Sequence, residues 1–299
     1  MTTAPLRTAV VIGCGTTGTS VALALTGAGV EVALVDDDPR ATAEAVALGA
    51  GTPWTPERPP ADLVVVATPP SAVVDVLHSA QSRGLGHVYT DTAGTKEIVA
   101  SDAELRGCDL KGYVPGHPLA GPDAAGRDAA DAARFADRTW VLCPYETTPE
   151  WALETLDALL AACGAQRLDL APHVHDRVVA ELSHAPHLVA AVLSSRFADS
   201  SAAFLGLAEQ SLRDAVRTAG GDPWVWGDVL AHNAGPVADV LDRIAGQLTR
   251  AAALLREGDD SAPFELALTL EQGRRGQSAL DDTRDDLRTP RDAPAAGRV

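Results

Sequence analysis

The stretch TAVVIGCGTTGTSVALALTGAGVEVALVD, residues 8–36, decides how the rest of the chain is interpreted. Residues 9–12 form a short apolar run of the kind that parallel sheets bury. The turn G-x-G-x-x-G follows at 13–18, and a helical apolar pattern then continues to about residue 27. A second apolar run, 30–35, ends on Asp36. This order of strand, glycine turn, helix, strand and acid predicts a dinucleotide site.

Each residue of the turn has a mechanical reason to be there. Gly13 allows the tight turn, Gly15 lets a pyrophosphate approach the backbone, and Gly18 lets helix and strand pack closely. Thr16 and Thr17 open the helix, whose free N–H groups and partial positive charge suit a phosphate. The alternative is a buried glycine turn that binds nothing.

Asp36 is positioned to accept hydrogen bonds from the two hydroxyls of an adenosine ribose. With Asp37 and Asp38 it would repel a 2′-phosphate, so NAD is favoured over NADP. Arg40 is the residue that could reverse this preference by reaching round to such a phosphate.

Composition narrows the class of protein. The chain has 299 residues, 46% of them hydrophobic, which is enough for one large or two medium domains. A formal charge of −17 argues against nucleic acid and anionic membranes as partners. The four cysteines show no paired spacing, no apolar run is long enough to span a bilayer, and the N-terminus is too short for a signal peptide. These features predict a cytoplasmic protein.

Further strands are predicted at residues 62–67, 87–91, 138–142 and 165–170, alternating with helices, and residues 112–121 are predicted to be a short strand running into a turn. Thr68 and Pro69 follow the first of these, at the strand end that faces the ligand crevice, and are predicted to contact the cofactor. Residues 1–171 are therefore predicted to form a parallel α/β, Rossmann-type dinucleotide-binding domain.

The character of the chain changes after Pro172. Helical spacing recurs at 173–197, 202–219, 223–246, 247–257 and 264–280, with no convincing strand. Residues 172–280 are thus predicted to form an all-α domain, whose apolar faces suit a homodimer and a monomer core equally well. The charged, Pro-containing tail, 281–299, is predicted to be disordered.

Three polar clusters could carry chemistry. His117 lies between Gly116 and Pro118 at a strand end, where an imidazole can take a hydroxyl proton while hydride leaves the same carbon. A surface turn histidine is the plainer interpretation. Arg213 and Arg217, four apart on one helix face, favour either a fork for a substrate carboxylate or a solvated ion-paired face.

The third cluster is residues 181–187, E-L-S-H-A-P-H. Pro186 is expected to kink the helix and free a carbonyl near residue 182. His184 and His187, three apart, suggest a metal site, but no further ligand motif is present and no metal is predicted.

Taken in order, the motifs resemble the prephenate/arogenate dehydrogenase family over about residues 8–280. They are G-x-G-x-x-G, Thr68-Pro69, Asp91-x-x-x-x-Lys96, G-H-P-L-A-G at 116–121, His175-Asp176, Ser183-His184-x-Pro186-His187, Arg213-Asp214-x-x-Arg217 and Asp222-Pro223-x-x-Trp226.

The resemblance implies an NAD-dependent oxidative decarboxylation in tyrosine biosynthesis. Prephenate would give 4-hydroxyphenylpyruvate, or arogenate would give tyrosine, as hydride leaves ring C4 for NAD. His117 would help remove the proton of the 4-substituent and Arg217 would bind a substrate carboxylate. The substrate-contacting residues implied are Ser183, His187, Trp226 and Thr95.

Departures from the family pattern leave alternatives open. Gly94 stands where serine is usual, Leu212 replaces a common Phe, and Pro122-Asp123 follow the glycine of the histidine loop. Gly94 motivates a second hypothesis, a dehydrogenase of specialised metabolism acting on 4-amino-4-deoxyprephenate.

Two rival classes share part of this pattern. A catalytically silent NAD-binding sensor would tolerate changes at His117 and Arg217, yet all three clusters are present. A β-hydroxyacid dehydrogenase or imine reductase commonly uses a lysine on the first long helix of its second domain, and residues 173–197 contain none.

Overall fold

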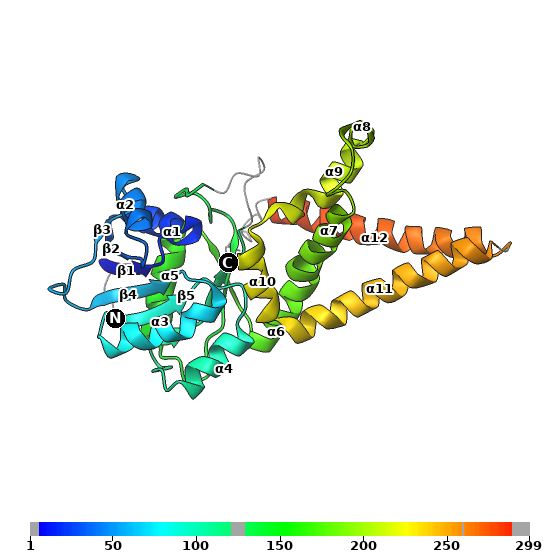
Figure 1. The fold of residues 1–299 in the computed structure, drawn as a ribbon. Coiled ribbons are helices and arrows are strands. Elements are labelled where there is room, and N and C mark those ends of the chain that lie inside the picture. Colours follow the sequence, from blue (N-terminus) through cyan, green and yellow to red (C-terminus); the bar gives the residue numbers. More distant parts are fainter. Residues whose placement is uncertain (1–5, 121–128, 259, 289–299) are drawn as a thin grey trace, which may run out of the picture. The chain divides into compact units, whose positions relative to one another are not determined.

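A computed structural model describes residues 6–120, 129–258 and 260–288, and side chains as far as residue 282 (Figure 1). Two compact units result, Met1–Val240 and Leu241–Val299. The first carries every described residue discussed as a site below.

The core of the first unit is a parallel sheet of six strands in the order β3-β2-β1-β4-β5-β6. Its strands are β1 Thr8–Ile12, β2 Glu31–Val35, β3 Thr52–Pro53, β4 Ala61–Val66, β5 Gly86–Asp91 and β6 Tyr113–Val114. The order reverses between β1 and β4, and ligands of such sheets bind at that point, beyond the carboxyl ends of the strands. The predicted α/β fold is confirmed.

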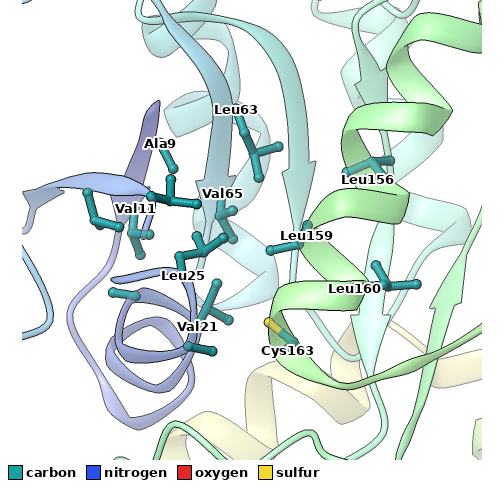
Figure 2. Close-up of a cluster of buried hydrophobic side chains, with 14 of the residues drawn as sticks. Ala9, Val11, Val21, Leu25, Leu63, Val65, Leu156, Leu159, Leu160 and Cys163 are labelled. Atoms are coloured by element: carbon teal, nitrogen blue, oxygen red, sulfur yellow. The ribbon is translucent and has the colours of Figure 1, made fainter. Parts of the chain in front are cut away.

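The helices associated with this sheet are α1 Thr16–Gly27, α2 Pro39–Ala47, α3 Pro70–Ser82, α4 Glu97–Leu105 and α5 Glu150–Cys163. Figure 2 shows Val21 and Leu25 of α1 and Leu159 of α5 beside the strand residues Val11 and Val65. All five side chains are completely buried, so the apolar runs read from the sequence do form the core.

A second, three-stranded sheet departs from the expected single parallel sheet. It has the order β7-β8-β9, formed by Gly116–Pro118, Thr139–Leu142 and Gln166–Asp169, and β7 pairs antiparallel with β8. Pro115 has no N–H with which to continue the ladder of β6, and its carbonyl accepts from Cys143 instead. The chain therefore leaves the first sheet one residue before Gly116 and carries His117 into the second.

From residue 172 to residue 288, the described part of the chain consists of helices joined by turns, as predicted. The elements in the first unit are α6 Pro172–Val179, the π-helix η1 Ala180–His184, α7 Ala185–Ser195, α8 Ala202–Leu205, α9 Gln210–Val216, the 3₁₀ turn η2 Arg217–Gly220 and α10 Pro223–Ala231. Helix α11, Ala234–Glu257, begins in the first unit and ends in the second. The predicted boundary at residue 171 coincides with this change of structure, and the division into domains stays a prediction.

Two expectations about the helices are refined. The kink expected at Pro186 takes the form of the π-helix η1, whose wider turn precedes the proline at the start of α7. In the second unit, α12 spans Ala262–Arg288, so residues 281–288 of the predicted disordered tail are helical. Residues 289–299 lie outside the described part. Among the described residues, no helix is long and apolar enough to cross a membrane.

Candidate active site

A cleft of about 620 Å³ lies at the carboxyl ends of β1, β2 and β4. Five of the eight residues predicted to bind the cofactor line it: Gly13, Gly15, Asp36, Thr68 and Pro69. The other three, Thr16, Thr17 and Gly18, form the first turn of α1 beside it. A cleft of this size suits a nucleotide.

The three glycines of the turn have the geometries that the motif predicts. Gly13 has φ +100°, a conformation that side chains disfavour, and a Cβ there would lie 2.4 Å from the carbonyl oxygen of Ala67. A Cβ on Gly15 would meet nothing within 4 Å, which leaves room for a ligand against the backbone. A Cβ on Gly18 would lie 1.9 Å from the carbonyl oxygen of Gly13.

Gly18→Ala is therefore expected to lower the free energy of unfolding by about 1–3 kcal/mol and to weaken NAD binding, because the methyl group must displace the turn. Gly27, in the same helix, provides the matched control, since a Cβ there would enter open space. Urea unfolding and NAD titration of Gly18→Ala and Gly27→Ala check this. Equal behaviour of the two variants would contradict the close packing at Gly18.

Asp36 is held firmly at the end of β2. Its Oδ2 accepts from the backbone N–H of Cys14 at 2.6 Å and its Oδ1 from that of Asp38 at 2.8 Å. In the same cleft, the buried hydroxyl of Thr68 has no hydrogen-bond partner among the described residues. These two groups fit a bound dinucleotide. The anchored carboxylate can accept further hydrogen bonds from a ribose, and the nucleotide can supply the partner that the Thr68 hydroxyl lacks.

A fully buried ion pair supports the histidine loop. Lys96 contacts the carboxylate of Asp91 and donates to the carbonyl of Gly116 at 2.6 Å. The hydroxyl of Tyr113 donates to Asp91 at 2.8 Å, and burial together with that carboxylate raises the pKa of Tyr113 well above its usual 10. The network fixes the residue immediately before His117.

His117 belongs to a chain of three side chains. Its Nδ1 lies 2.8 Å from Nε2 of His175, and Nδ1 of His175 lies 2.7 Å from Oδ1 of Asp176. Asp176 also accepts the backbone N–H groups of Lys96 at 2.8 Å and of Glu97 at 2.8 Å. A carboxylate with these donors is an acceptor only.

These hydrogen bonds determine which ring nitrogen of each histidine carries the hydrogen. Because Asp176 accepts, Nδ1 of His175 carries a hydrogen and its Nε2 accepts from Nδ1 of His117. Nε2 of His117 is left with a free lone pair, which is the form a general base needs. Burial, followed by the neighbouring His175 and Lys96, lowers the pKa of His117 well below 6.5.

The two histidines suspected of binding a metal have other partners. His184 is buried, and its Nδ1 lies 3.0 Å from Nδ2 of Asn233. The ring of His187 stacks on Trp226 with centroids 3.6 Å apart. A Cβ on Gly221 would lie 3.2 Å from Cε1 of His187, so the turn after η2 covers this pair.

The remaining predicted residues differ in position. Arg217 opens η2, which packs against α7, and its side chain is exposed. Helix α9 ends at Val216, so Arg213 and Arg217 do not share one continuous α-helix as expected. Ser183 is exposed, whereas Thr95 is completely buried with no partner for its hydroxyl among the described residues.

The structure thus places His117 in hydrogen-bond contact with a residue that the spacing of residues along the chain did not identify. The sequence presents His175 and Asp176 as a motif without a role, and it gives no reason to select Asn233. The available signal is three ionisable residues close together at the start of a helix, His173, His175 and Asp176, of which two are buried. Pro122 and Asp123 lie outside the described residues.

A dinucleotide cleft and a histidine with a free ring nitrogen lie in one unit, an arrangement typical of an NAD-dependent dehydrogenase. Comparison with known protein families makes this specific. The model for the nucleotide-binding domain of prephenate dehydrogenase matches residues 21–168, and that for its dimerization domain matches residues 171–272. The chain belongs to the prephenate dehydrogenase family, which confirms the resemblance read from its motifs.

Individual relatives agree. A probable prephenate dehydrogenase, NovF, from Streptomyces niveus is 38% identical over 91% of this chain and 76% of its own length. A cyclohexadienyl dehydrogenase from Zymomonas mobilis is 30% identical over 67% of this chain and 70% of its own. The structure of prephenate dehydrogenase from A. aeolicus with hydroxyphenyl propionate and NAD⁺ shares the fold, with 22% identity, a TM-score of 0.79, and coverage of 93% of this chain and 99% of that one.

Proposed function

We propose that this enzyme oxidatively decarboxylates prephenate, or its amino counterpart arogenate, with NAD as hydride acceptor. The observation that carries the proposal is the chain from Asp176 through His175 to His117, which leaves a free lone pair on Nε2 of His117. Prephenate and cyclohexadienyl dehydrogenases are also the activities named for the relatives.

His117 is the base in this proposal. Its Nε2 takes the proton of the C4 hydroxyl as the C4–H bond breaks, and the positive charge that develops is stabilised through His175 by Asp176. NAD, when bound, supplies a hydride acceptor. Loss of carbon dioxide from C1 then makes the ring aromatic, so the protein mainly has to orient and deprotonate.

Other residues are assigned by the resemblance together with their positions. Arg217 would bind a substrate carboxylate, because it is exposed and begins the short helix η2, which leads into Gly221 beside His187 and Trp226. Ser183, His187 and Trp226 would line the substrate pocket. Thr95 would contact the substrate through its buried hydroxyl, which has no hydrogen-bond partner among the described residues.

The test is a comparison of three substrates. Prephenate, arogenate and 4-amino-4-deoxyprephenate are each supplied with NAD or NADP, and reduced cofactor is followed by absorbance. We expect kcat/KM to be highest for prephenate or arogenate with NAD. Intact NAD binding without turnover of any of the three would instead support a silent sensor.

The 4-amino substrate is retained as a second candidate because of Gly94. A Cβ there would lie 3.6 Å from Cγ1 of Val229, 3.8 Å from Nε2 of His184 and 3.9 Å from Cε1 of His117, so a glycine at this position leaves about the room of a methyl group beside His117. The Cβ of a Gly94→Ser variant would make only ordinary van der Waals contacts, and this is the variant with which to probe the candidate. Equal or better use of prephenate by the unaltered enzyme removes this candidate.

The pH dependence follows from the state of His117. The base works unprotonated and its pKa lies below 6.5, so kcat/KM should hold as pH falls to 6.5 and decline only as pH falls through the lowered pKa. A pH profile of kcat/KM, with the unfolding temperature measured at each pH as control, checks this. An acid limb centred above pH 7 would contradict it.

Assembly and location complete the proposal. Apolar side chains of α7 and α10 are exposed in the single chain, notably Val192 at 61% and Trp224 at 87%. Together with the match to a dimerization domain they support a homodimer, which light scattering would detect as twice the mass of one chain. Four buried, unpaired cysteines support a reducing, cytoplasmic location.

A further inference from the structure

His184 is a buried histidine that borders the same space as the base. It closes the π-helix η1, and its side chain is almost completely buried. A Cβ on Gly94 would lie 3.6 Å from Cγ1 of Val229, 3.8 Å from Nε2 of His184 and 3.9 Å from Cε1 of His117, so these three side chains border one position. π-helical turns often occur at functional sites, because the extra residue redirects a side chain.

Asn233 fixes the hydrogen on this ring. Its Nδ2 lies 2.8 Å from the backbone carbonyl oxygen of Asp176 and 3.0 Å from Nδ1 of His184. The carbonyl can only accept, so the amide NH₂ group must face it, and the second hydrogen of that group points to Nδ1. His184 therefore accepts at Nδ1 and carries its hydrogen on Nε2, the atom nearest Gly94.

The ring is also neutral at ordinary pH. Burial, the largest cause, lowers the pKa of His184 to about 4 despite the opposing effect of Asp176. His117 and His184 thus differ in chemistry beside Gly94. His184 has its N–H donor there, and His117 has Cε1 there, the ring carbon bonded to its free Nε2.

We propose that Nε2–H of His184 donates to the oxygen on C4 of the substrate, with Asn233 as the positioning residue that holds it in this tautomer. The inference rests on the proposed function and deepens it by adding a donor for the reacting oxygen.

The electron count shows why a donor is useful there. The C4–H pair leaves as hydride and the hydroxyl proton goes to His117, so C4 becomes a carbonyl. The bond from C1 to its carboxylate then breaks, carbon dioxide leaves, and the electron pair moves through the ring onto the C4 oxygen. Negative charge develops on that oxygen before His117 returns the proton, and a fixed N–H stabilises it.

The assignment also selects a substrate class. An N–H donor needs a lone pair opposite it, which a hydroxyl or carbonyl oxygen provides and an ammonium group does not. His184 therefore favours oxygen over a protonated amine at C4, and so favours prephenate or arogenate over the 4-amino compound.

The experiment compares His184→Phe, which removes the donor, with His184→Gln, whose amide nitrogen can take the place of Nε2. With prephenate and NAD, His184→Phe is expected to lower kcat about 100-fold with little change in KM, and His184→Gln to recover much of that loss. The Kd for NAD should be unchanged in both, because His184 does not line the dinucleotide cleft.

The outcomes separate this inference from the proposed function. Wild-type turnover together with a folded His184→Phe variant of unchanged kcat overturns the donor role alone. Absence of turnover in the wild type overturns both. Where His184→Phe does not fold, ¹⁵N-histidine NMR of the wild type decides the tautomer: a hydrogen on Nε2 supports the assignment, and one on Nδ1 overturns it.

Discussion

Replacing His117 with glutamine is expected to lower kcat by about 10²–10⁴-fold, because it removes the base while leaving a side chain of similar size and polarity. His117 lies outside the dinucleotide cleft, so the Kd for NAD should stay within about twofold. Steady-state kinetics with prephenate and a fluorescence titration with NAD measure the two effects separately.

His173→Gln is the matched control, since His173 is exposed on α6, two residues from His175, the hydrogen-bond partner of His117. It should keep wild-type kcat. A His117→Gln variant whose kcat stays within threefold of the wild-type value would contradict the role of His117 as the base. The hypothesis of a silent NAD-binding sensor would then be favoured.

Lys96→Met is expected to lower the free energy of unfolding by about 3–5 kcal/mol. Lys96 and Asp91 have no exposed side-chain surface, and removing the ammonium leaves a buried carboxylate with only neutral donors: the Tyr113 hydroxyl and backbone N–H groups. The lost bond to the Gly116 carbonyl should also loosen the residue before His117 and lower kcat.

The chain offers an internal control for this effect. Lys111 is the one other lysine in the sequence and is exposed, so Lys111→Met should change the unfolding free energy by less than about 0.5 kcal/mol. Adding Asp91→Leu to Lys96→Met should cost less than the sum of the two single changes, because the stranded charge is removed as well. Urea unfolding of the four variants tests this, and simple additivity would contradict a coupled pair.

The fold was largely predictable because its signals are local. Apolar strands of four to six residues, glycines at fixed offsets and a proline-marked change to helices all lie within short windows, and the strand order 3-2-1-4-5-6 accompanies that pattern. The second sheet was not predicted, because only part of its cause is local. Pro115 lacks the N–H that would extend β6, but the partner its carbonyl finds, Cys143, is distant in sequence.

The row of hydrogen-bonded side chains from His117 to Asp176 was predictable from local sequence in its first member only. The setting of His117 between a glycine and a proline identified a loop histidine at a strand end, yet its partner His175 is 58 residues away. Asn233 is 49 residues from His184. Neither pairing leaves a trace in spacing along the chain, because tertiary packing of the helices that follow residue 171 creates them. Only the resemblance drew attention to His175 and Asp176.

The spacing of Arg213 and Arg217 gave a wrong prediction of their local structure. A spacing of four residues predicts one helix face, but α9 ends at Val216 and Arg217 enters a 3₁₀ turn. The two glycines that follow, Gly220 and Gly221, are the local signal for that break. The carboxylate-binding role of Arg217 accordingly stays a proposal.

The most direct test of the proposed chemistry follows the atoms. Prephenate carrying deuterium at C4 is incubated with the enzyme and NAD, and the reduced cofactor, the carbon dioxide and the aromatic product are quantified by mass spectrometry. We expect one deuterium in each reduced NAD and equal amounts of all three products, with the reaction abolished in His117→Gln. Reduced NAD without deuterium, or carbon dioxide release at an undiminished rate in that variant, would contradict the proposed role of His117 and the hydride transfer from C4.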